Sequence, residues 1–202
     1  MSASAEHRLI LASKSKSRAS VLRAAGLSFE QVGSGVDEEA LKDALRAEGA
    51  SVAKQADLLA ETKALKVSIS HLGVVLGCDQ MLDHDGQGLD KVSTREEAAD
   101  VLRSLRGKTH TLQSAIVACV EGAPVWRHLS QPKLRMRNFS DDFLEGYLDA
   151  IGDAAFESVG CYQIEGLGAQ LFDRIEGDYF SILGMPLLPL MQWLRDRGSL
   201  LP

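Results

Sequence analysis

The fold is decided by the stretch VVLGCDQMLDHDGQGLDK, which occupies residues 74–91. It opens with three apolar residues, Val74 to Leu76, and such a run is typical of a β-strand that is buried on both faces. Gly77 ends the apolar run, and Asp79 follows while the chain is still expected to lie near the core. A buried carboxylate is costly without a cation or hydrogen-bond donors around it, so Asp79 is a candidate functional residue.

The second half of this stretch predicts a hairpin. The Asp and Gly residues at 83–88 are typical of a turn, which would bring Leu89, Asp90 and Lys91 back beside the first strand. One hairpin would then place the ammonium group of Lys91 in the neighbourhood of the Asp79 carboxylate. Two interpretations stay open for this stretch alone: a buried Asp–Lys ion pair that only stabilises the fold, or part of a site for a charged ligand.

Length and composition limit the class of protein. The 202 residues are enough for one large domain or for two small lobes that share a core. Hydrophobic residues make up 45% and charged residues 25%, which is typical of a globular protein. The formal net charge of −6 argues against binding to nucleic acid as the main activity. An acidic chain that handles anions must gather its positive charge locally, so clusters of Lys and Arg become informative.

The spacing of the cysteines and the length of the apolar runs indicate in which cellular compartment the chain is expected. Cys78, Cys119 and Cys161 are widely separated and form no CxxC pair, which favours a reduced, cytoplasmic chain over a structural zinc protein. We expect no signal peptide and no membrane partner, since no apolar run approaches the roughly 18 residues of a transmembrane helix. The small and polar residues at 1–7 are expected to be disordered.

A candidate anion site follows the first predicted strand, at residues 8–12. The strand leads into Ser-Lys-Ser-Lys-Ser-Arg at 13–18 and then into an amphipathic helix that stops at Gly26. The N-terminus of such a helix offers unpaired N–H groups and a positive dipole end, to which Ser, Lys and Arg side chains add donors and charge. The alternative is that a Ser only caps the helix while the basic side chains face water. The segment lacks the GxxxxGK[ST] pattern of a P-loop.

The remaining pattern predicts an α/β protein with a mixed sheet. Further strands are expected at 29–32, 109–120, 125–129, 133–139 and 169–175. Helices are expected over 39–67 with a break near Gly49, from the Thr94/Glu97 capping box to before Gly107, over 141–150 after Ser140, and over 187–197 after Pro186. Strands and helices alternate irregularly, with an antiparallel run in the second half, which argues against a doubly wound Rossmann order.

Three further features have a plain structural interpretation when each is taken alone. The acids in Val-Asp-Glu-Glu at 36–39 would be the N-terminal residues of a helix. Lys63, a single Lys on an amphipathic helix, would face solvent. The glycines of residues 158–169 indicate close approach of the backbone, either to a ligand or to another chain segment.

Taken together and in order, these segments resemble the Maf (septum-formation) family of nucleoside triphosphate pyrophosphatases. The resemblance covers about residues 8 to 198 and rests on LASKSKSR at 11–18, VDE at 36–38, LAETKA at 59–64, GCDQ at 77–80 with Lys91, GCYQIEGLG at 160–168, IEGDY at 175–179 and GMPL at 184–187. It implies an ITPase-like α/β fold with two lobes around a deep cleft, so we expect residues 8–202 to form a single Maf-like domain. Dimers are common in the family, and a homodimer is expected on the same ground.

The resemblance assigns the binding of the triphosphate. The family's phosphate-binding turn matches Ser13, Ser15 and Arg18, and its two phosphate-contacting lysines match Lys63 and Lys91. The chain departs from the family pattern at Lys16, which replaces a proline, at Ser17, which replaces an arginine, and at Asp90 and Val92, which replace the Gly and Pro around the second lysine. The phosphate-contacting lysine of the second loop is kept as Lys91 despite the changes on either side of it.

The resemblance also assigns the chemistry. Asp79 matches the catalytic aspartate and Glu38 a metal-linked glutamate, and the two would hold Mg²⁺ or Mn²⁺ through oxygen ligands, with waters completing the shell. The metal would lower the pKa of a bound water and polarise the α-phosphate, while Asp79 orients or deprotonates that water. Attack at the α-phosphorus would release pyrophosphate and leave a nucleoside monophosphate.

Three positions separate the substrate branches of the family, and here they hold Ser17, Gln80 and Glu165. Gln80 and Glu165 match the branch resembling 7-methyl-GTP pyrophosphatases, whereas Ser17 matches neither that branch nor the dTTP/UTP branch. A carboxylate at 165 would accept N1–H and N2–H₂ of a guanine edge and would repel the carbonyl acceptors of uracil and thymine. Gln80 would either donate to O6 of the base or brace the Asp79 loop. We therefore expect a guanine-type substrate such as 7-methyl-GTP in preference to dTTP and UTP.

Two other functions stay open at this point. A nucleotide-binding regulator of cell division would act by occupancy or partner contact with little catalysis, and the departures at Lys16, Ser17 and Val92 leave room for it. In a protein without nucleotide chemistry the charged residues would be merely structural, and their family spacing would be a coincidence.

Overall fold

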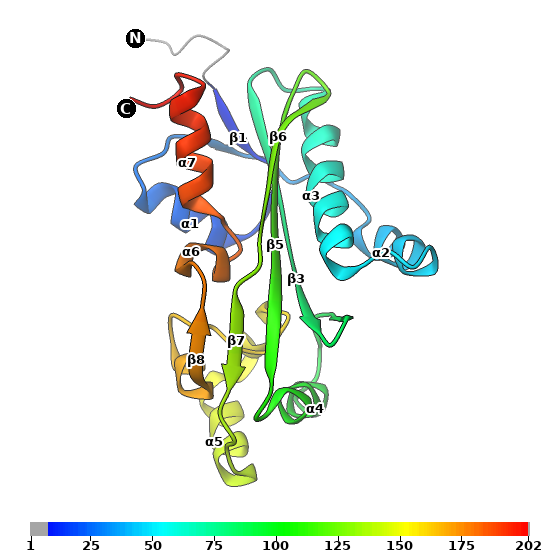
Figure 1. Ribbon diagram of the computed structural model, residues 1–202, viewed down its shortest axis with the longest axis vertical. Coiled ribbons are helices and arrows are strands. Elements are labelled where there is room, and N and C mark those ends of the chain that lie inside the picture. The colour runs from blue at the N-terminus through cyan, green and yellow to red at the C-terminus, as the bar shows by residue number, and fades with distance from the viewer. Residues whose placement is uncertain (1–7, 202) are drawn as a thin grey trace. The chain divides into compact units, whose positions relative to one another are not determined.

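The structure, a computed structural model that describes residues 8–201, is a mixed α/β fold built on an eight-stranded sheet (Figure 1). The strand order is β2-β1-β3-β5-β7-β8, with β4 paired to β3 and β6 paired to β5. Strands β1 and β2 run parallel, as do β1 and β3, whereas the pairs β3–β4, β5–β6, β5–β7 and β7–β8 are antiparallel. The predicted class, α/β with a mixed sheet, is confirmed. The expected disorder of residues 1–7 lies outside the described residues.

The elements follow the predicted order closely. The strands are β1 (Leu9–Leu11), β2 (Glu30–Gln31), β3 (Val74–His84), β4 (Gln87–Leu89), β5 (Thr109–Val120), β6 (Ala123–Ser130), β7 (Lys133–Met136) and β8 (Phe172–Glu176). The helices are α1 (Lys16–Ala24), α2 (Glu38–Ala47), α3 (Val52–Ser68), α4 (Arg95–Leu105), α5 (Asp141–Ile151), α6 (Tyr179–Ile182) and α7 (Leu187–Asp196), with 3₁₀ helices η2 (Gly152–Glu157) and η3 (Leu167–Leu171). Among these described helices none has both the length and the apolar character needed to cross a membrane.

Helix boundaries are set by capping side chains, as the sequence predicts. Thr94 accepts a hydrogen bond from Glu97 N while the Glu97 side chain accepts one from Thr94 N, so the capping box of α4 is complete. Ser140 accepts from Phe143 N at the start of α5. Gly49, in the break between α2 and α3, has a positive φ of 73°, which glycine adopts at little cost.

The structure differs from the predicted local structure in three places. The strand expected at 133–139 ends already at Met136. The strand expected at 169–175 begins only at Phe172, because Leu167–Leu171 form the 3₁₀ helix η3. Helix α6 was not predicted, since four residues are too short to show a helical period, and only the Asp178 cap marks its start. Its side chain accepts hydrogen bonds from the backbone N–H groups of Phe180 and Ser181.

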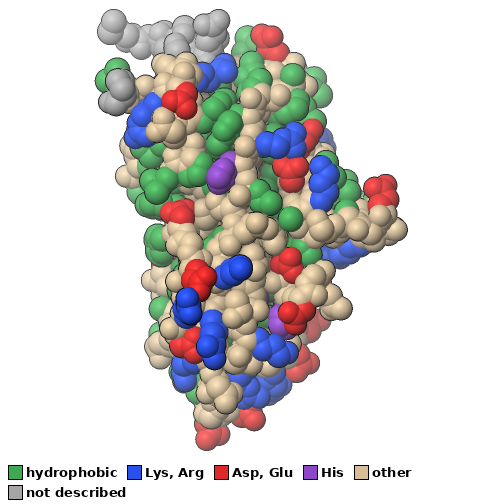
Figure 2. All heavy atoms as spheres, in the orientation of Figure 1, with side chains coloured by type: hydrophobic (Ala, Val, Ile, Leu, Met, Phe, Trp, Pro, Cys, Tyr) green, Lys and Arg blue, Asp and Glu red, His purple; other side chains and the backbone are tan. Residues whose placement is uncertain are grey.

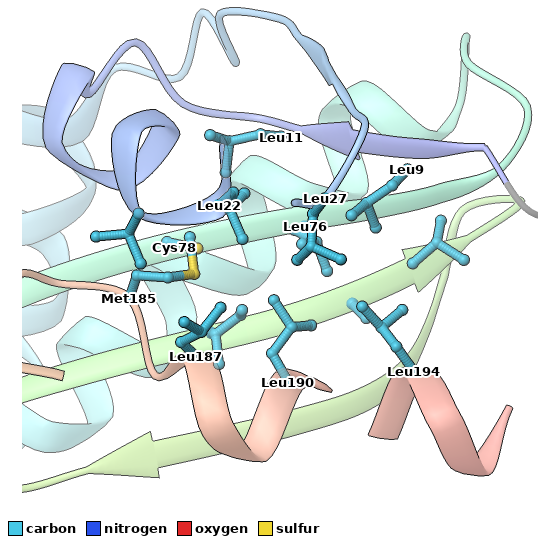
Figure 3. Packing of buried hydrophobic residues seen from close by; sticks show 14 of the residues in the cluster. Leu9, Leu11, Leu22, Leu27, Leu76, Cys78, Met185, Leu187, Leu190 and Leu194 are labelled. Carbon is cyan, nitrogen blue, oxygen red and sulfur yellow. The ribbon is translucent and has the colours of Figure 1, made fainter. Parts of the chain in front are cut away.

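The contacts of the chain divide it into two compact units. Among the described residues the first comprises 8–80, 113–130 and 178–201, and the second comprises Met81–Leu112 and Gln131–Gly177. In the first unit, α1 and α7 lie on one side of the strands and α3 on the other (Figure 1). Leucines of β1, α1 and α7 converge there with Leu76 and Cys78 of β3 in a buried cluster (Figure 3).

Strand β3 does not end at Gly77 but continues through Asp79 to His84. A Cβ atom at Gly77 would lie 2.0 Å from Ala60 O and 2.7 Å from Ala64 N of α3, so the glycine serves close approach of this helix to the strand. Side chains alternate along a strand. Leu76 and Cys78 therefore point into the cluster under α1 and α7, and Asp79 points to the α3 side.

The second unit contains the predicted hairpin. Strands β3 and β4 pair with Leu82 opposite Leu89 and His84 opposite Gln87, and the connecting Asp85 and Gly86 both have positive φ. Two positive φ values in a two-residue connection are typical of a hairpin turn whose twist matches that of the strands. Over β7 and β8, basic and acidic side chains are interspersed on the face shown in Figure 2, where Arg135 lies 3.8 Å from Asp173 and Arg174 2.7 Å from Glu176.

Candidate active site

Lys63 lies between two carboxylates in the first unit. Its Nζ atom is 2.7 Å from Asp79 Oδ1 and 2.8 Å from Glu38 Oε2. Lys63 and Asp79 are only 4% and 5% exposed, whereas the Glu38 side chain is 45% exposed. The expectation that a single Lys on α3 faces solvent is therefore wrong. A buried Asp–Lys ion pair exists, but the lysine that Asp79 pairs with is Lys63.

Small residues bring this trio together. Ala60 and Ala64 of α3 lie against Gly77 of β3, and this contact sets the helix directly on the strand. Lys63, on the same turn of α3, then reaches Asp79, two residues after Gly77. Glu38 is the first residue of α2, after the Asp37 cap, as the interpretation of a helix-terminal acid requires. Its side chain also contacts Lys63 beside Asp79, so a position at the start of a helix is compatible with the expected role of Glu38 as a metal-linked glutamate.

The second oxygen of the Asp79 carboxylate is available for chemistry. Among residues 8–201, no group donates a hydrogen bond to the buried Oδ2 atom. A buried carboxylate oxygen normally has a donor or a cation beside it, because leaving it unsatisfied costs free energy. The lysine ammonium has three N–H donors, of which the two carboxylates use two. Asp79 Oδ2 and one Lys63 N–H thus remain for a ligand.

Cys78 is excluded as a nucleophile although it neighbours these charges. Desolvation by burial raises the pKa of its thiol to about 11, and the nearby positive charges of Arg18 and Lys63 offset this only in part. Since the thiolate is the reactive form of cysteine, the Cys78 thiol is inert near neutral pH. Its side chain belongs to the apolar cluster beneath α1 and α7.

The serine-rich turn combines both interpretations that the sequence left open. Ser15 caps α1, accepting a hydrogen bond from Arg18 N at 3.3 Å. The Ser13 hydroxyl accepts from Ser15 N and from Arg18 Nη1, and Arg18 Nε donates to Gly184 O at 3.0 Å. These are the hydrogen bonds of the Arg18 side chain within residues 8–201, so three of its five N–H groups remain for an anion.

Gln80, next to the catalytic candidate, is held by the protein itself. Its Nε2 atom donates to Ser114 Oγ at 2.7 Å and to the carbonyl oxygens of Ser181 and Ile182, both at 3.0 Å. Carbonyl oxygens only accept, so the amide nitrogen must face them. This geometry favours the bracing interpretation of Gln80 over donation to O6 of a base. The Ser17 hydroxyl also points to this segment, at 3.4 Å from Leu183 O.

Lys91 and Glu165 belong to the second unit. Lys91 is exposed and follows β4, and Glu165 is exposed in the turn before η3. The loop that carries Glu165 is firmly built: Ser158 Oγ donates to Tyr162 O and accepts from Tyr162 N, and Cys161 has a positive φ of 58°. A left-handed non-glycine residue costs free energy, which the surrounding contacts must supply.

The glycines of this loop permit close packing against the chain itself. A Cβ at Gly160 would lie 2.2 Å from the Tyr162 ring, and one at Gly168 would lie 2.5 Å from Gln163 O. Of the two interpretations left open by the sequence, the structure supports approach to another chain segment at these positions. The Tyr162 hydroxyl is in turn hydrogen-bonded to His110 Nε2 at 2.8 Å. Burial lowers the pKa of His110 to about 4, so this histidine is neutral near pH 7.

Sequence reasoning missed several residues that hold the site together. Gln31 of β2 donates to Ser13 O at 2.9 Å, and Ser114 of β5 bridges Gln80 and Ser181 O. Such long-range side-chain partners leave no periodic signal in a sequence. Asp178 does leave a local signal, because Asp is one of the residues preferred at the N-cap of a helix.

The residues present suit a hard divalent cation. Within the described chain no group of three or more His, Cys, Asp and Glu side chains is arranged around a common metal position. Two carboxylates, Asp79 and Glu38, share one ammonium group, and Asp79 Oδ2 is buried without a donor among the described residues. A site of two carboxylates fits Mg²⁺ or Mn²⁺, which keep several waters and take further oxygens from substrate phosphates.

Comparison with known proteins finds a family model and several relatives that match almost the whole chain. The family model described as Maf-like protein matches residues 8–197. The protein named nucleoside triphosphate pyrophosphatase from Hyphomonas neptunium is 54% identical over 190 residues, covering 94% of this chain and 96% of the relative. The protein of the same name from Paramagnetospirillum magneticum is 52% identical over 194 residues, covering 96% and 100%. The 7-methyl-GTP pyrophosphatase of Brucella abortus biovar 1 is 43% identical over 189 residues, covering 93% and 95%.

Proposed function

This chain belongs to the Maf family, and from that premise we propose that it hydrolyses a guanine-type nucleoside triphosphate to the monophosphate and pyrophosphate, with Asp79 as the catalytic carboxylate. Its class is that of a nucleoside triphosphate pyrophosphatase, a hydrolase, as for relatives of 54% and 52% identity over almost their whole length. The observation that carries the assignment of Asp79 is its buried Oδ2 atom, which lacks a donor among residues 8–201 while Oδ1 is held by Lys63.

Asp79 would act on the attacking water. Lys63 fixes the carboxylate through Oδ1, so Oδ2 is the atom that accepts a proton from a water placed against the α-phosphorus. The water oxygen then forms a bond to the α-phosphorus, and the bond from this phosphorus to the bridging oxygen breaks. Pyrophosphate leaves with the bridging oxygen, and the proton passes from Asp79 to solvent.

Positive charge for the triphosphate would come from the turn and from α3. Arg18 has three N–H groups that the protein does not use within the described chain, and the ordered serine turn lies beside it. Lys63 contributes one further N–H close to Asp79. Arginine forks match phosphate oxygens in a bidentate manner, which fixes orientation as well as charge. Lys91, from the second unit, is proposed to bind the phosphates as well, as the family pattern implies.

A divalent cation would complete the site. Asp79 and Glu38 would hold Mg²⁺ or Mn²⁺, which supplies Lewis-acid polarisation of the phosphate and a more acidic water when bound. The chain's own part is to offer two carboxylates from separate elements, one buried and one half-exposed. Lys63 balances part of their charge and so keeps both carboxylates oriented.

The base preference is proposed to follow from Glu165. This carboxylate is exposed at the tip of a firmly held loop, so it can accept two hydrogen bonds from N1–H and N2–H₂ of a guanine. Support comes from the 43% identical relative from Brucella abortus biovar 1, which is named for 7-methyl-GTP, whereas the 54% and 52% relatives carry a name without a base. With Gln80 engaged by carbonyls, Glu165 becomes the main reader of the base.

The test is pyrophosphate release from 7-methyl-GTP, GTP, UTP and dTTP with Mn²⁺, in the wild type and in Asp79→Asn. We expect the highest kcat/KM for 7-methyl-GTP and a loss of at least a hundredfold in kcat in the Asn variant, the size typical of a lost general base. Glu165→Gln should shift the preference toward UTP and dTTP. A wild type that prefers UTP or dTTP would overturn the base assignment. A chain that binds nucleotide but releases no pyrophosphate would point instead to the regulator of cell division.

The cytoplasmic location and the homodimer stay predictions. Light scattering coupled to size exclusion would check the second. A mass near twice the 21.8 kDa of the chain would support the dimer, and a mass near that of one chain would contradict it.

A further inference from the structure

The segment from Asp178 to Met185 is the common partner of three side chains of the site. Three carbonyl oxygens of helix α6 accept from backbone N–H groups that follow it, namely Tyr179 O from Leu183 N, Phe180 O from Met185 N and Ser181 O from Gly184 N. A carbonyl oxygen has two lone pairs, so the carbonyl groups of this segment can also accept from side chains. Gln80 Nε2 donates to Ser181 O and Ile182 O, Ser17 Oγ to Leu183 O, and Arg18 Nε to Gly184 O. Four consecutive carbonyl groups thus orient two of the proposed specificity positions and the proposed phosphate-binding arginine.

Asp178 fixes this row of carbonyl groups. Its Oδ2 atom accepts from Ser181 N at 2.8 Å and from Ser181 Oγ at 2.6 Å, and its Oδ1 atom accepts from Phe180 N at 3.3 Å. Hydrogen bonds to an ionised carboxylate are shorter and stronger than those between neutral groups. Ser181 is fully buried, and its carbonyl also accepts from Ser114 Oγ at 2.7 Å.

The bond from Arg18 Nε to Gly184 O determines where the guanidinium points. Because the guanidinium is planar, a bond at Nε fixes the direction of both terminal nitrogens. Gly184 has a positive φ of 80°, and a Cβ there would lie 3.3 Å from Arg18 Nε. This conformation of the segment, which the Asp178 cap holds at its other end, brings the Gly184 carbonyl to Arg18 and leaves little room for a side chain at position 184.

We infer that Asp178 is a positioning residue of the pyrophosphatase site, which acts through the carbonyl groups of residues 181–184 on Arg18, Ser17 and Gln80. Asp178 itself touches no proposed substrate-binding side chain in the hydrogen bonds described for residues 8–201. The inference rests on the proposed function. It adds that substrate affinity and base discrimination both depend on a carboxylate outside the reacting centre.

The experiment compares Asp178→Ala with Ser140→Ala. Ser140 caps α5 in the second unit, accepting from Phe143 N at 3.2 Å, and takes no part in this network. Both variants lose a helix cap, so a merely structural role predicts that they behave alike. We expect Asp178→Ala to raise KM for 7-methyl-GTP at least tenfold and to change the kcat/KM ratio of 7-methyl-GTP to UTP at least threefold. Ser140→Ala should leave both quantities within twofold of the wild type.

A second variant keeps the test decisive if Asp178→Ala does not fold. Ser181→Ala removes only the hydroxyl that donates to Asp178 Oδ2 and keeps the backbone. KM for 7-methyl-GTP should rise about threefold in this variant, which is less than in Asp178→Ala. An unchanged KM and an unchanged substrate ratio in Ser181→Ala, or an Asp178→Ala variant that matches Ser140→Ala, would overturn the inference while the wild type stays active. A wild type that releases no pyrophosphate from any triphosphate would overturn the proposed function and this inference with it.

Discussion

At the scale of the residue, the charge of Lys63 is compensated within the protein by Asp79 and Glu38. Bringing an ammonium group and a carboxylate into a buried site costs desolvation free energy that their attraction only partly returns. Such a pair therefore contributes little net free energy to folding, and stability alone does not explain its presence. Its position, with one carboxylate oxygen left over, suits a site that exchanges an internal partner for phosphate and metal.

Removal of the buried ammonium should be costly. Lys63→Met leaves the buried Asp79 without its cation, and we expect the free energy of unfolding to fall by about 3 kcal/mol. Lys54→Met is the matched control, since Lys54 lies on the same helix with a half-exposed side chain 3.5 Å from Asp57. Exposed pairs contribute about 1 kcal/mol or less. Urea denaturation measures both variants, and equal losses would contradict the account of Lys63.

Metal binding should depend on both carboxylates. A cation held by Asp79 and Glu38 together would lose at least tenfold in affinity when either is replaced by Ala, because one carboxylate alone holds it weakly. Titration calorimetry of Mn²⁺ in the presence of a non-hydrolysable triphosphate measures this directly. Glu39→Ala, at the exposed neighbouring position, serves as control. If Glu38→Ala titrates like the wild type, Glu38 is only a helix-terminal acid.

At the scale of the element, the contact between α3 and β3 holds the site. Gly77→Ala would place a Cβ 2.0 Å from Ala60 O, so α3 must move away from the strand and carry Lys63 with it. Overpacking of this kind costs about 1–3 kcal/mol. We expect a loss of at least 2 kcal/mol in the free energy of unfolding, together with reduced activity.

The matched control is Gly146→Ala in α5. Among the described residues nothing lies within 4 Å of a Cβ at this position. Replacing glycine by alanine inside a helix stabilises by about 0.5–1 kcal/mol. Opposite signs for the two substitutions, measured by urea denaturation, are the expected outcome. Equal and small changes in the free energy of unfolding for the two substitutions would contradict the account that close contact of α3 with β3 holds the site.

A second element, β5, anchors the Glu165 loop through His110. Burial lowers the pKa of His110 to about 4 from its ordinary 6.5, so the unfolded chain takes up a proton at this histidine more readily than the folded protein. The free energy of unfolding is therefore unaffected by this proton above pH 6.5, and it falls by about 3 kcal/mol as the pH drops from 6.5 to 4.

His110→Gln should therefore flatten the dependence of stability on pH between 6.5 and 4. Glutamine retains a hydrogen-bonding group toward Tyr162 but does not titrate. Unfolding midpoints at several pH values measure the slope, and a slope in His110→Gln equal to that of the wild type would contradict this assignment.

At the scale of the whole molecule, the sequence predicts the element order and the mixed sheet, because caps, glycines and apolar periods are local signals. The capping box at Thr94 and Glu97 and the cap at Ser140 are examples. What it could not predict depends on partners distant in the chain. The lysine that pairs with Asp79 comes from α3 and not from the neighbouring hairpin, and the two carbonyl acceptors of Gln80 lie 101 and 102 residues further along the chain.

The distribution of charge fits the function proposed for the whole chain. With a net charge of −6, the protein repels anions in general. Arg18 supplies positive charge in the first unit, with N–H groups left over by the described hydrogen bonds, whereas the charge of Lys63 is offset by Asp79 and Glu38. A triphosphate would therefore be drawn to the serine-rich turn beside Arg18 rather than to the surface as a whole.

The central claim is that water, deprotonated at Asp79, attacks the α-phosphorus. Hydrolysis of 7-methyl-GTP in ¹⁸O-labelled water, followed by mass spectrometry of both products, tests this claim most directly. The account predicts one ¹⁸O atom in the nucleoside monophosphate and none in the pyrophosphate, at a rate reduced at least a hundredfold in Asp79→Asn. Label in the pyrophosphate, or release of labelled phosphate with a nucleoside diphosphate, would contradict it.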